Sequence, residues 1–181
     1  SDFRDGNMLS FSMWIKPELT NVSSEVRLIT FHSGANAGTA LSLGLTKTKI
    51  VLNYRGLKNR LETFEKEVAL NDNSWHHIAL SSNQNSIKIF VDGKSEAFIR
   101  TQVVSSFGAH AAHLGSYTGF QKGYIGLMDE VTIFNTLISN SEVSSLHADR
   151  ASNDPRDFVD SKSLLSWYRM SDSNNDSGSN I

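Results

Sequence analysis

The sequence predicts an all-β fold in which two antiparallel sheets pack as a sandwich or jelly roll, with one short helix near the C-terminus. Apolar and polar residues alternate with period two through most of the 181 residues, as expected for strands that present one face to a core. Short polar turns separate these segments, and no strand alternates with a long helix, which argues against a parallel α/β fold. A closed barrel is the weaker alternative.

The first third of the chain contains four expected strands. In the first of them, Phe11, Met13 and Ile15 share one side, and Pro17 ends the run because proline cannot donate to a strand ladder. Asn, Ser, Gly and Lys-rich turns separate the others. The expected strands are Leu9 to Lys16, Val26 to Phe31, Leu41 to Leu45 and Lys49 to Tyr54.

The middle of the chain predicts a three-stranded meander, and further strands follow it. Asp92-Gly93 offers the positive-φ geometry that closes a tight hairpin between two of the three strands. In the whole chain, about ten strands are expected from this spacing of strand and turn signals. They are Trp75 to Ser81, Ser86 to Val91, Lys94 to Ile99, His110 to Gly115, Gly123 to Asn135 and Leu164 to Met170.

The expected helix begins at Ser139. Ser139 and Glu142 form a capping-box pattern in which each side chain satisfies the other residue's free backbone N–H, and Val143 and Leu146 then supply a narrow apolar stripe. The last eleven residues, 171–181, contain a single apolar residue, and we interpret them as a polar tail.

Composition narrows the classes of function. The net charge is -2, from 17 basic and 19 acidic side chains without basic blocks, so neither nucleic-acid binding nor attachment to an anionic membrane is expected. No apolar run is long enough for a membrane span. The absence of cysteine excludes disulfides, thiolate zinc sites and cysteine nucleophiles. The chain starts without an initiator Met or a signal-peptide profile, and we expect it to be part of a larger polypeptide or assembly.

Four segments carry a family resemblance. They are LSFSMWIKP from Leu9, WHHIA from Trp75, IKIFVDG from Ile87, and Gly123 to Asn135 followed by the capped helix. In order and spacing they resemble the laminin-G-like, concanavalin-A-like jelly roll shared with pentraxins, over residues 8–150. The resemblance implies a domain on an extracellular or virion surface.

The segment Leu164 to Met170, followed by Ser171 and Asp172, resembles a Trp-x-Arg-Met-x-Asp strand of similar domains in phage and microbial surface proteins. In those domains the strand comes first, and here it comes last. Either it closes the sheet of a permuted domain, or it begins a second module. We favour closure, because an orphan strand this rich in Leu, Trp, Tyr and Met would expose a large apolar patch. We therefore predict one domain over residues 1–170.

The sequence lacks catalytic patterns, so we predict that the domain is not an enzyme. Related glucanases hold two carboxylates on one strand face in a Glu-x-Asp-x-x-Glu pattern, which does not occur here. Glu62, Glu65 and Glu67 read as a charged edge strand. Asp129 and Glu130 are adjacent, so their side chains point to opposite faces of a strand and do not form a catalytic pair by themselves.

Metal sites are also poorly supported. His76 and His77 face opposite ways in a strand, and His110 and His113 would also diverge if extended. Calcium is the one cofactor to consider, because Asp172, Asn174 and Asp176 alternate as in the first half of a calcium loop. A polar linker is the alternative. The pentraxin calcium segment corresponds to residues 116–120, which contain no acid, so calcium-bridged binding is not carried over.

Sugar binding needs an aromatic face and planar polar groups. Candidates at strand ends and loop tips are Tyr54, Arg55, Asn59, Tyr117 and Phe120. The alternative is that Tyr54 packs in the sheet and Phe120 anchors a loop.

We expect the three tryptophans, Trp14, Trp75 and Trp167, to lie in the core. The predicted function is non-catalytic recognition of a glycan or another extracellular polymer, as in adhesion or host attachment. The alternative is a structural or assembly module that packs against sister subunits and binds no sugar.

Overall fold

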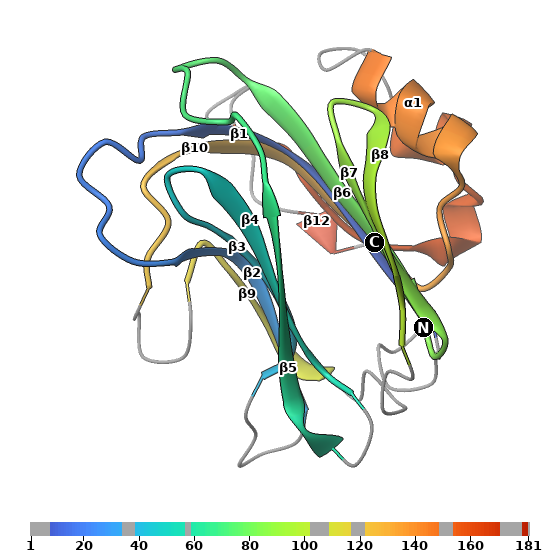
Figure 1. Ribbon diagram of the computed structural model, residues 1–181. Coiled ribbons are helices and arrows are strands. Elements are labelled where there is room, and N and C mark those ends of the chain that lie inside the picture. Colours follow the sequence, from blue (N-terminus) through green and yellow to red (C-terminus); the bar gives the residue numbers. More distant parts are fainter. Residues whose placement is uncertain are drawn as a thin grey trace.

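The computed structural model is a two-layer antiparallel sandwich (Figure 1), which confirms the predicted fold class. It describes residues 8–33, 39–56, 59–101, 109–116, 122–148, 154–170 and 179–180. The strands are β1 (Met8–Pro17), β2 (Val26–Ser33), β3 (Thr39–Leu45), β4 (Lys49–Arg55), β5 (Leu61–Glu67), β6 (His76–Asn83), β7 (Ser86–Val91), β8 (Lys94–Arg100), β9 (Ala109–Leu114), β10 (Gly126–Phe134), β11 (Leu164–Tyr168) and β12 (Ser179–Asn180). The helices are α1 (Asn140–Ala148) and the short 3-10 helices η4 (Pro155–Asp157) and η5 (Ser161–Ser163).

One sheet has seven strands in the order β12-β11-β10-β1-β6-β7-β8, and the other has five in the order β5-β4-β3-β2-β9. All neighbouring pairs are antiparallel. The β6-β7-β8 meander and its turn are as predicted, with φ of 47° at Asp92 and 75° at Gly93. Twelve strands are described where the sequence predicts about ten, and β12 falls within the predicted polar tail.

The main core lies between the two sheets. Phe11, Met13 and Ile15 of β1 are fully buried and face the five-stranded sheet, where the ring of Phe31 lies 6.1 Å from that of Phe11. Ile50 and Leu52 of β4 are equally buried. The period-two alternation therefore assigns the inward faces of β1 and β4 correctly.

A second, smaller core covers the outer face of the seven-stranded sheet. Its buried residues come from that sheet, from α1 and from the segments beside it: Ala79, Phe90, Phe134, Ile138, Val143, Leu146, Val159 and Leu164. Figure 1 shows α1 (orange) on the β7-β8 side of this sheet. Because of this cover, Ser10 and Ser12 are buried although they alternate with core residues.

The helix starts with the predicted capping box. The Ser139 backbone N–H donates to Glu142 Oε2 (2.6 Å), and the Glu142 N–H donates to Ser139 Oγ (3.2 Å). Val143 and Leu146 are the buried residues of α1. The capping box and the apolar stripe therefore place α1 on the sheet as the sequence predicts.

Strand β11 is held in place by two neighbouring acidic residues at a β-bulge in β10. Glu130 has a φ of 48°, and it accepts hydrogen bonds from Trp167 Nε1 (2.6 Å) and Arg169 Nε (3.2 Å). Asp129 accepts from the Met170 backbone N–H (3.2 Å). These two acids therefore fasten β11, and the residues that follow it, to β10. The division of the chain into a domain of residues 1–170 and a tail stays a prediction.

The prediction that all three tryptophans are core residues is wrong, because Trp14, Trp75 and Trp167 are each only partly buried. Trp14 lies on the outer face of β1, where its ring stacks on His147 of α1 with centroids 5.5 Å apart. Alternation identifies the face of a strand but does not tell whether that face is covered completely.

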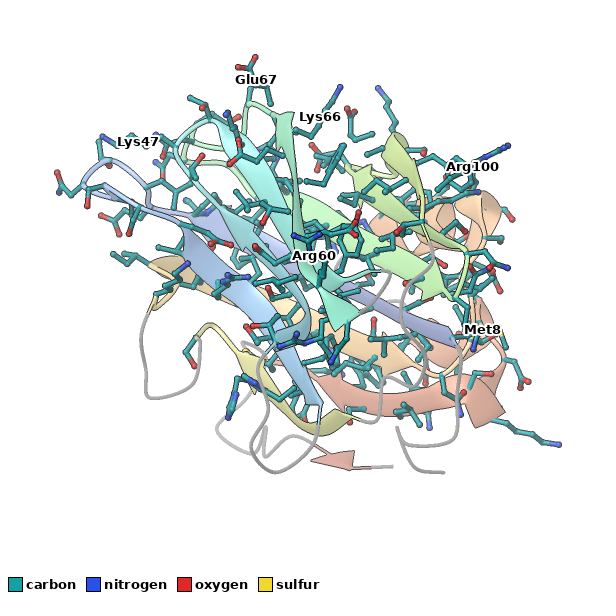
Figure 2. All side chains as sticks on the ribbon, turned by 60° about the horizontal axis from the view of Figure 1, so that its bottom comes forward. Met8, Lys47, Arg60, Lys66, Glu67 and Arg100 are labelled. Carbon is teal, nitrogen blue, oxygen red and sulfur yellow. The ribbon has the colours of Figure 1, made fainter. Side chains whose placement is uncertain are left out.

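Strand β5 is the edge of the five-stranded sheet, as the charged sequence predicts. Glu65 accepts from Lys49 Nζ at 2.6 Å, across the β4-β5 pair. Figure 2 shows Lys66 and Glu67 near the end of this strand. No helix within the described ranges has the length and apolar character needed to cross a membrane.

Candidate functional site

A cleft of about 800 Å³ opens at one end of the sandwich. The end of β1 and the loop after it form one wall, the loop before β6 forms another, and the start of β10 completes the rim. The lining residues are Lys16, Pro17, Glu18, Thr20, Asn71, Asp72, Asn73, Gly126 and Leu127. A neighbouring cleft of about 660 Å³ shares Asn71 and Asp72 and extends to Lys47 and Glu67, which Figure 2 labels.

Backbone contacts hold the walls of the cleft in place. Pro17 pairs with Gly126, and the Glu18 N–H donates to the Ile125 carbonyl (3.0 Å). The facing loop is tied to the first wall because the Leu19 N–H donates to Asn71 Oδ1 (3.2 Å). A rigid strand pair therefore supports loops that lie far apart in the sequence.

Gly126 allows the two strands to approach closely at the rim. Its φ is 137°, a conformation that only glycine adopts readily, and an added Cβ would lie 2.3 Å from the Lys16 carbonyl oxygen. The neighbouring side chain of Leu127 is 59% exposed beside the cleft.

His76 fastens the loop that carries Asp72. Its Nε2 lies 2.9 Å from Asp72 Oδ1, and its Nδ1 lies 3.0 Å from Asp92 Oδ2. Burial lowers the pKa of His76, but the hydrogen bonds with Asp92 and Asp72 outweigh it, so the pKa is raised above its ordinary value of 6.5. When protonated, the imidazolium donates to both carboxylates at once.

The cleft offers hydrogen-bonding groups of several kinds. Glu18 and Asp72 supply carboxylates, Asn71 and Asn73 supply amides, and Thr20 supplies a hydroxyl. The hydrogen bond with His76 holds the pKa of Asp72 below its usual value, which is opposite to what a general acid requires. The chemistry of this cleft is therefore suited to hydrogen-bonding a polar ligand.

A comparison with profiles of protein families identifies the superfamily of this chain. A family profile described as the concanavalin A-like lectin/glucanases superfamily matches residues 1–144. The chain belongs to this superfamily. A comparison with curated protein sequences finds no match.

Several solved structures have a similar fold but low sequence identity to this chain. The CBM40 of the Ruminococcus gnavus IT-sialidase, bound to alpha2,3 sialyllactose, has a TM-score of 0.64 and 12% identity over 79% of this chain and 84% of that chain. The binding domain of Paraclostridial Mosquitocidal Protein 1 has a TM-score of 0.61 and 16% identity over 77% of this chain, but only 36% of its own length is covered. A heptameric SAP-like pentraxin from Limulus polyphemus has a TM-score of 0.57 and 12% identity over 79% of this chain and 70% of that chain. At these identities the likeness concerns the fold alone.

The prediction that Tyr54, on β4, contacts a sugar is wrong. Tyr54 is 6% exposed and belongs to the core between the sheets. Burial, together with a hydrogen bond to Glu62, raises the pKa of its hydroxyl. Its ring is therefore not available for stacking on a sugar, and the alternative reading of Tyr54 as a packed residue is confirmed.

The other ligand candidates do not meet at the cleft. Arg55 Nη1 donates to the Asn59 carbonyl (2.9 Å), and Asn59 is exposed with a φ of 58°. Arg55 is the last residue of β4 and Asn59 lies in the turn after it, whereas the neighbouring cleft includes Lys47, before the start of β4. Tyr117 and Phe120 fall outside the described residues.

The predicted calcium ligands Asp172, Asn174 and Asp176 also lie outside the described residues, so calcium binding stays a prediction. Within the described part of the chain, no three His, Asp or Glu side chains are grouped to hold a metal ion. An unchanged melting temperature after exhaustive chelation would contradict the calcium prediction.

Two polar groupings are not indicated by any local pattern in the sequence. On the outer face of the five-stranded sheet, Glu25 contacts Arg27 (3.1 Å), Asn53 (3.1 Å) and Lys122 (2.9 Å). On the seven-stranded sheet, Ser12 Oγ and His77 Nε2 are 2.7 Å apart. Alternation predicts the strand faces of Ser12 and His77, but no spacing in the sequence joins the members of either grouping.

The Ser12–His77 pair resembles a hydroxyl and its general base, but its burial rules out that use. Ser12 is 3% exposed and His77 is 0% exposed, under the cover of Trp14 and His147. A nucleophile must reach its substrate. The pair is therefore a packed structural contact.

Proposed function

We propose that this domain is a non-catalytic glycan-binding module and that a saccharide occupies the cleft at the end of the sandwich. The proposal places the parent protein on an extracellular or virion surface, with adhesion as its role. The observation that carries it is the convergence of amide, carboxylate and hydroxyl groups from three separate segments around one rigidly supported cleft.

Glycans present many hydroxyls, which both donate and accept, together with small apolar ring faces. Asn71, Asn73 and Thr20 offer matching donors and acceptors, and Glu18 adds an acceptor. The exposed side chain of Leu127 supplies an apolar surface at the rim. Superfamily membership and the fold shared with a sialyllactose-bound CBM40 support the same reading.

The alternative of an assembly module has less support. Among the residues that the structure describes, the exposed large apolar side chains come from several segments: Met8, Leu61, Phe98, Ile125, Leu127, Leu137 and Met170. A stable subunit interface normally concentrates such residues in one patch. The charged edge strand β5 also disfavours sheet-to-sheet pairing.

A glycan array followed by calorimetry with one neutral glycan from the array tests the proposal. Asn73 has a φ of 63°, so Asn73→Gly removes the amide without straining the backbone. Glu18→Ala removes the acceptor on the facing wall. Each change is expected to weaken binding about tenfold, as for the loss of one hydrogen-bonding partner.

The matched control is Arg60→Ala, because Arg60 is exposed and lies in the turn between β4 and β5, away from the cleft. It is expected to leave the affinity unchanged. An array without saturable binding, or an affinity that neither Asn73→Gly nor Glu18→Ala changes, would contradict the proposal.

A further inference from the structure

Phe98 is an exposed aromatic residue on the outer face of the β7-β8 hairpin. Its side chain is 52% exposed, although Ile99 and Ala97 beside it pack on the main core. Strand β8 is the edge of the seven-stranded sheet, and α1 packs against it. The ring therefore lies open to solvent next to a helix, on a part of the sheet that the second core leaves uncovered.

Two cations lie over this ring. Lys88 Nζ is 5.7 Å from the ring centroid, and Lys88 pairs with Phe98 across the hairpin. Arg100 Cζ is 5.9 Å from the same centroid. Lys88 Nζ also lies 3.5 Å from the amide oxygen of Asn140, the first residue of α1. One aromatic face, a guanidinium, an ammonium and an amide thus meet at one place.

Lys88 and Arg100 are among the described cations, such as Lys16 and Lys47, for which no ion pair with a described carboxylate is found, and they are the two that share one aromatic ring. Lys49, Lys122, Arg156 and Arg169 each have a carboxylate within 4.0 Å. Neither Lys88 nor Arg100 has such a partner among the described residues. Glu96 lies two residues before Phe98 on β8, but it forms no ion pair with Lys88 or Arg100 among the described residues, so both cations keep their charge for a ligand. The complement of this local positive charge is an anion.

We propose that Phe98, Lys88 and Arg100 form a second binding site, for a saccharide that carries a carboxylate. The apolar face of the pyranose ring packs against the exposed part of the Phe98 side chain, beside the two cations. The Arg100 guanidinium takes the carboxylate in a bidentate arrangement, and Lys88 adds a point charge. The Asn140 amide reaches a ring hydroxyl.

The site is separate from the end cleft. Lys88 is level with Ser81 and Ser10 across the sheet, six residues of β1 away from Lys16 at the cleft. At about 3.3 Å per residue this is about 20 Å along the strands. In the view of Figure 2, Arg100 and Lys47, which lines the neighbouring cleft, lie on opposite sides. The inference therefore goes beyond the proposed function and does not depend on it.

Calorimetric titration with matched charged and neutral sugars tests the site. The probes are sialyllactose against lactose, and trigalacturonate against its methyl ester, so the two arms separate sialic acids from uronic acids as the source of the carboxylate. We expect one charged probe to bind at least tenfold more tightly than its neutral match. The affinity is also expected to fall as salt rises.

The variants are Phe98→Ala and Arg100→Gln, with Arg60→Gln as the control for loss of one exposed arginine. Phe98 and Arg100 are exposed, so melting temperatures should be close to that of the wild type. Each of the two site variants is expected to lower the affinity for the charged probe at least tenfold, whereas Arg60→Gln and Asn73→Gly leave it unchanged.

Charged probes that bind no better than their neutral matches would overturn the second site. So would a charged probe whose affinity survives Phe98→Ala and Arg100→Gln. Loss of charged-probe binding in Asn73→Gly alone would assign that ligand to the cleft and would also overturn the second site, while leaving the proposed function standing.

Discussion

Protonation of His77 is expected to destabilise the fold in mild acid. The ring is fully buried between Ser12, Trp14 and His147, and its Nδ1 has no hydrogen-bond partner among the described residues. Burial, and then the neighbouring charge of His147, lower the pKa of His77 from 6.5 to about 3. The unfolded chain therefore binds a proton between these two pKa values that the folded chain does not bind.

The sign and size of the effect follow from this difference in pKa. Because the unfolded state binds more protons in this range, the free energy of unfolding falls as the pH falls from 6.5 toward 3. Each pH unit corresponds to about 1.36 kcal/mol. Between pH 7.5 and pH 5.0, His77 alone therefore removes about 2 kcal/mol from the free energy of unfolding.

Urea unfolding at pH 7.5 and pH 5.0 checks this value in the wild type and in His77→Gln. The glutamine cannot take up a proton, and other titrating groups contribute to both proteins. The wild type is expected to lose about 2 kcal/mol more than the variant between the two pH values. Equal losses in the two proteins, or an NMR titration of the His77 ring centred near pH 6.5, would refute the reasoning.

Two further predictions concern the walls of the cleft. Gly126→Ala forces a Cβ to within 2.3 Å of the Lys16 carbonyl oxygen at a φ of 137°, and it is expected to lower the free energy of unfolding by at least about 2 kcal/mol. The control in the same urea unfolding experiments is Gly123→Ala, because a Cβ at that position meets nothing within 4 Å. A similar loss of stability in both variants would argue against the steric cause. The pKa of His76 is raised in the folded state, so its contribution to stability is present below pH 6.5 and is lost as the pH rises through the raised value. Urea midpoints of the wild type should therefore approach those of His76→Gln above that pH, and a constant gap between the two would contradict the assignment.

Much of the fold was predictable because local patterns carry it. The alternation of Phe11, Met13 and Ile15 identifies the inward face of β1, and the Ser139–Glu142 capping box marks the start of α1. The turn at Asp92-Gly93 defines the β7-β8 hairpin for the same reason. Each of these signals lies within a few residues of the structure it specifies.

The candidate site was not predictable in the same way. Glu18, Asn71 and Leu127 meet only because β1, β6 and β10 are neighbours in one sheet, and no local pattern states this pairing. Tyr54 is a sugar-binding candidate because it lies at a strand end, although its alternation with Ile50 and Leu52 places it on the inward face. In this chain, the strand face on which a residue lies predicts its burial better than whether the residue is at the end of the strand.

The most direct test of the central proposal is a titration of the ¹⁵N-labelled domain with a neutral glycan selected on the array, followed by NMR. The account predicts saturable shifts of backbone amides that concentrate at residues 16–20, 71–73 and 126–127, around the cleft. Shifts that concentrate on the outer face of the five-stranded sheet, or the absence of shifts at these three segments when the glycan is bound, would contradict it.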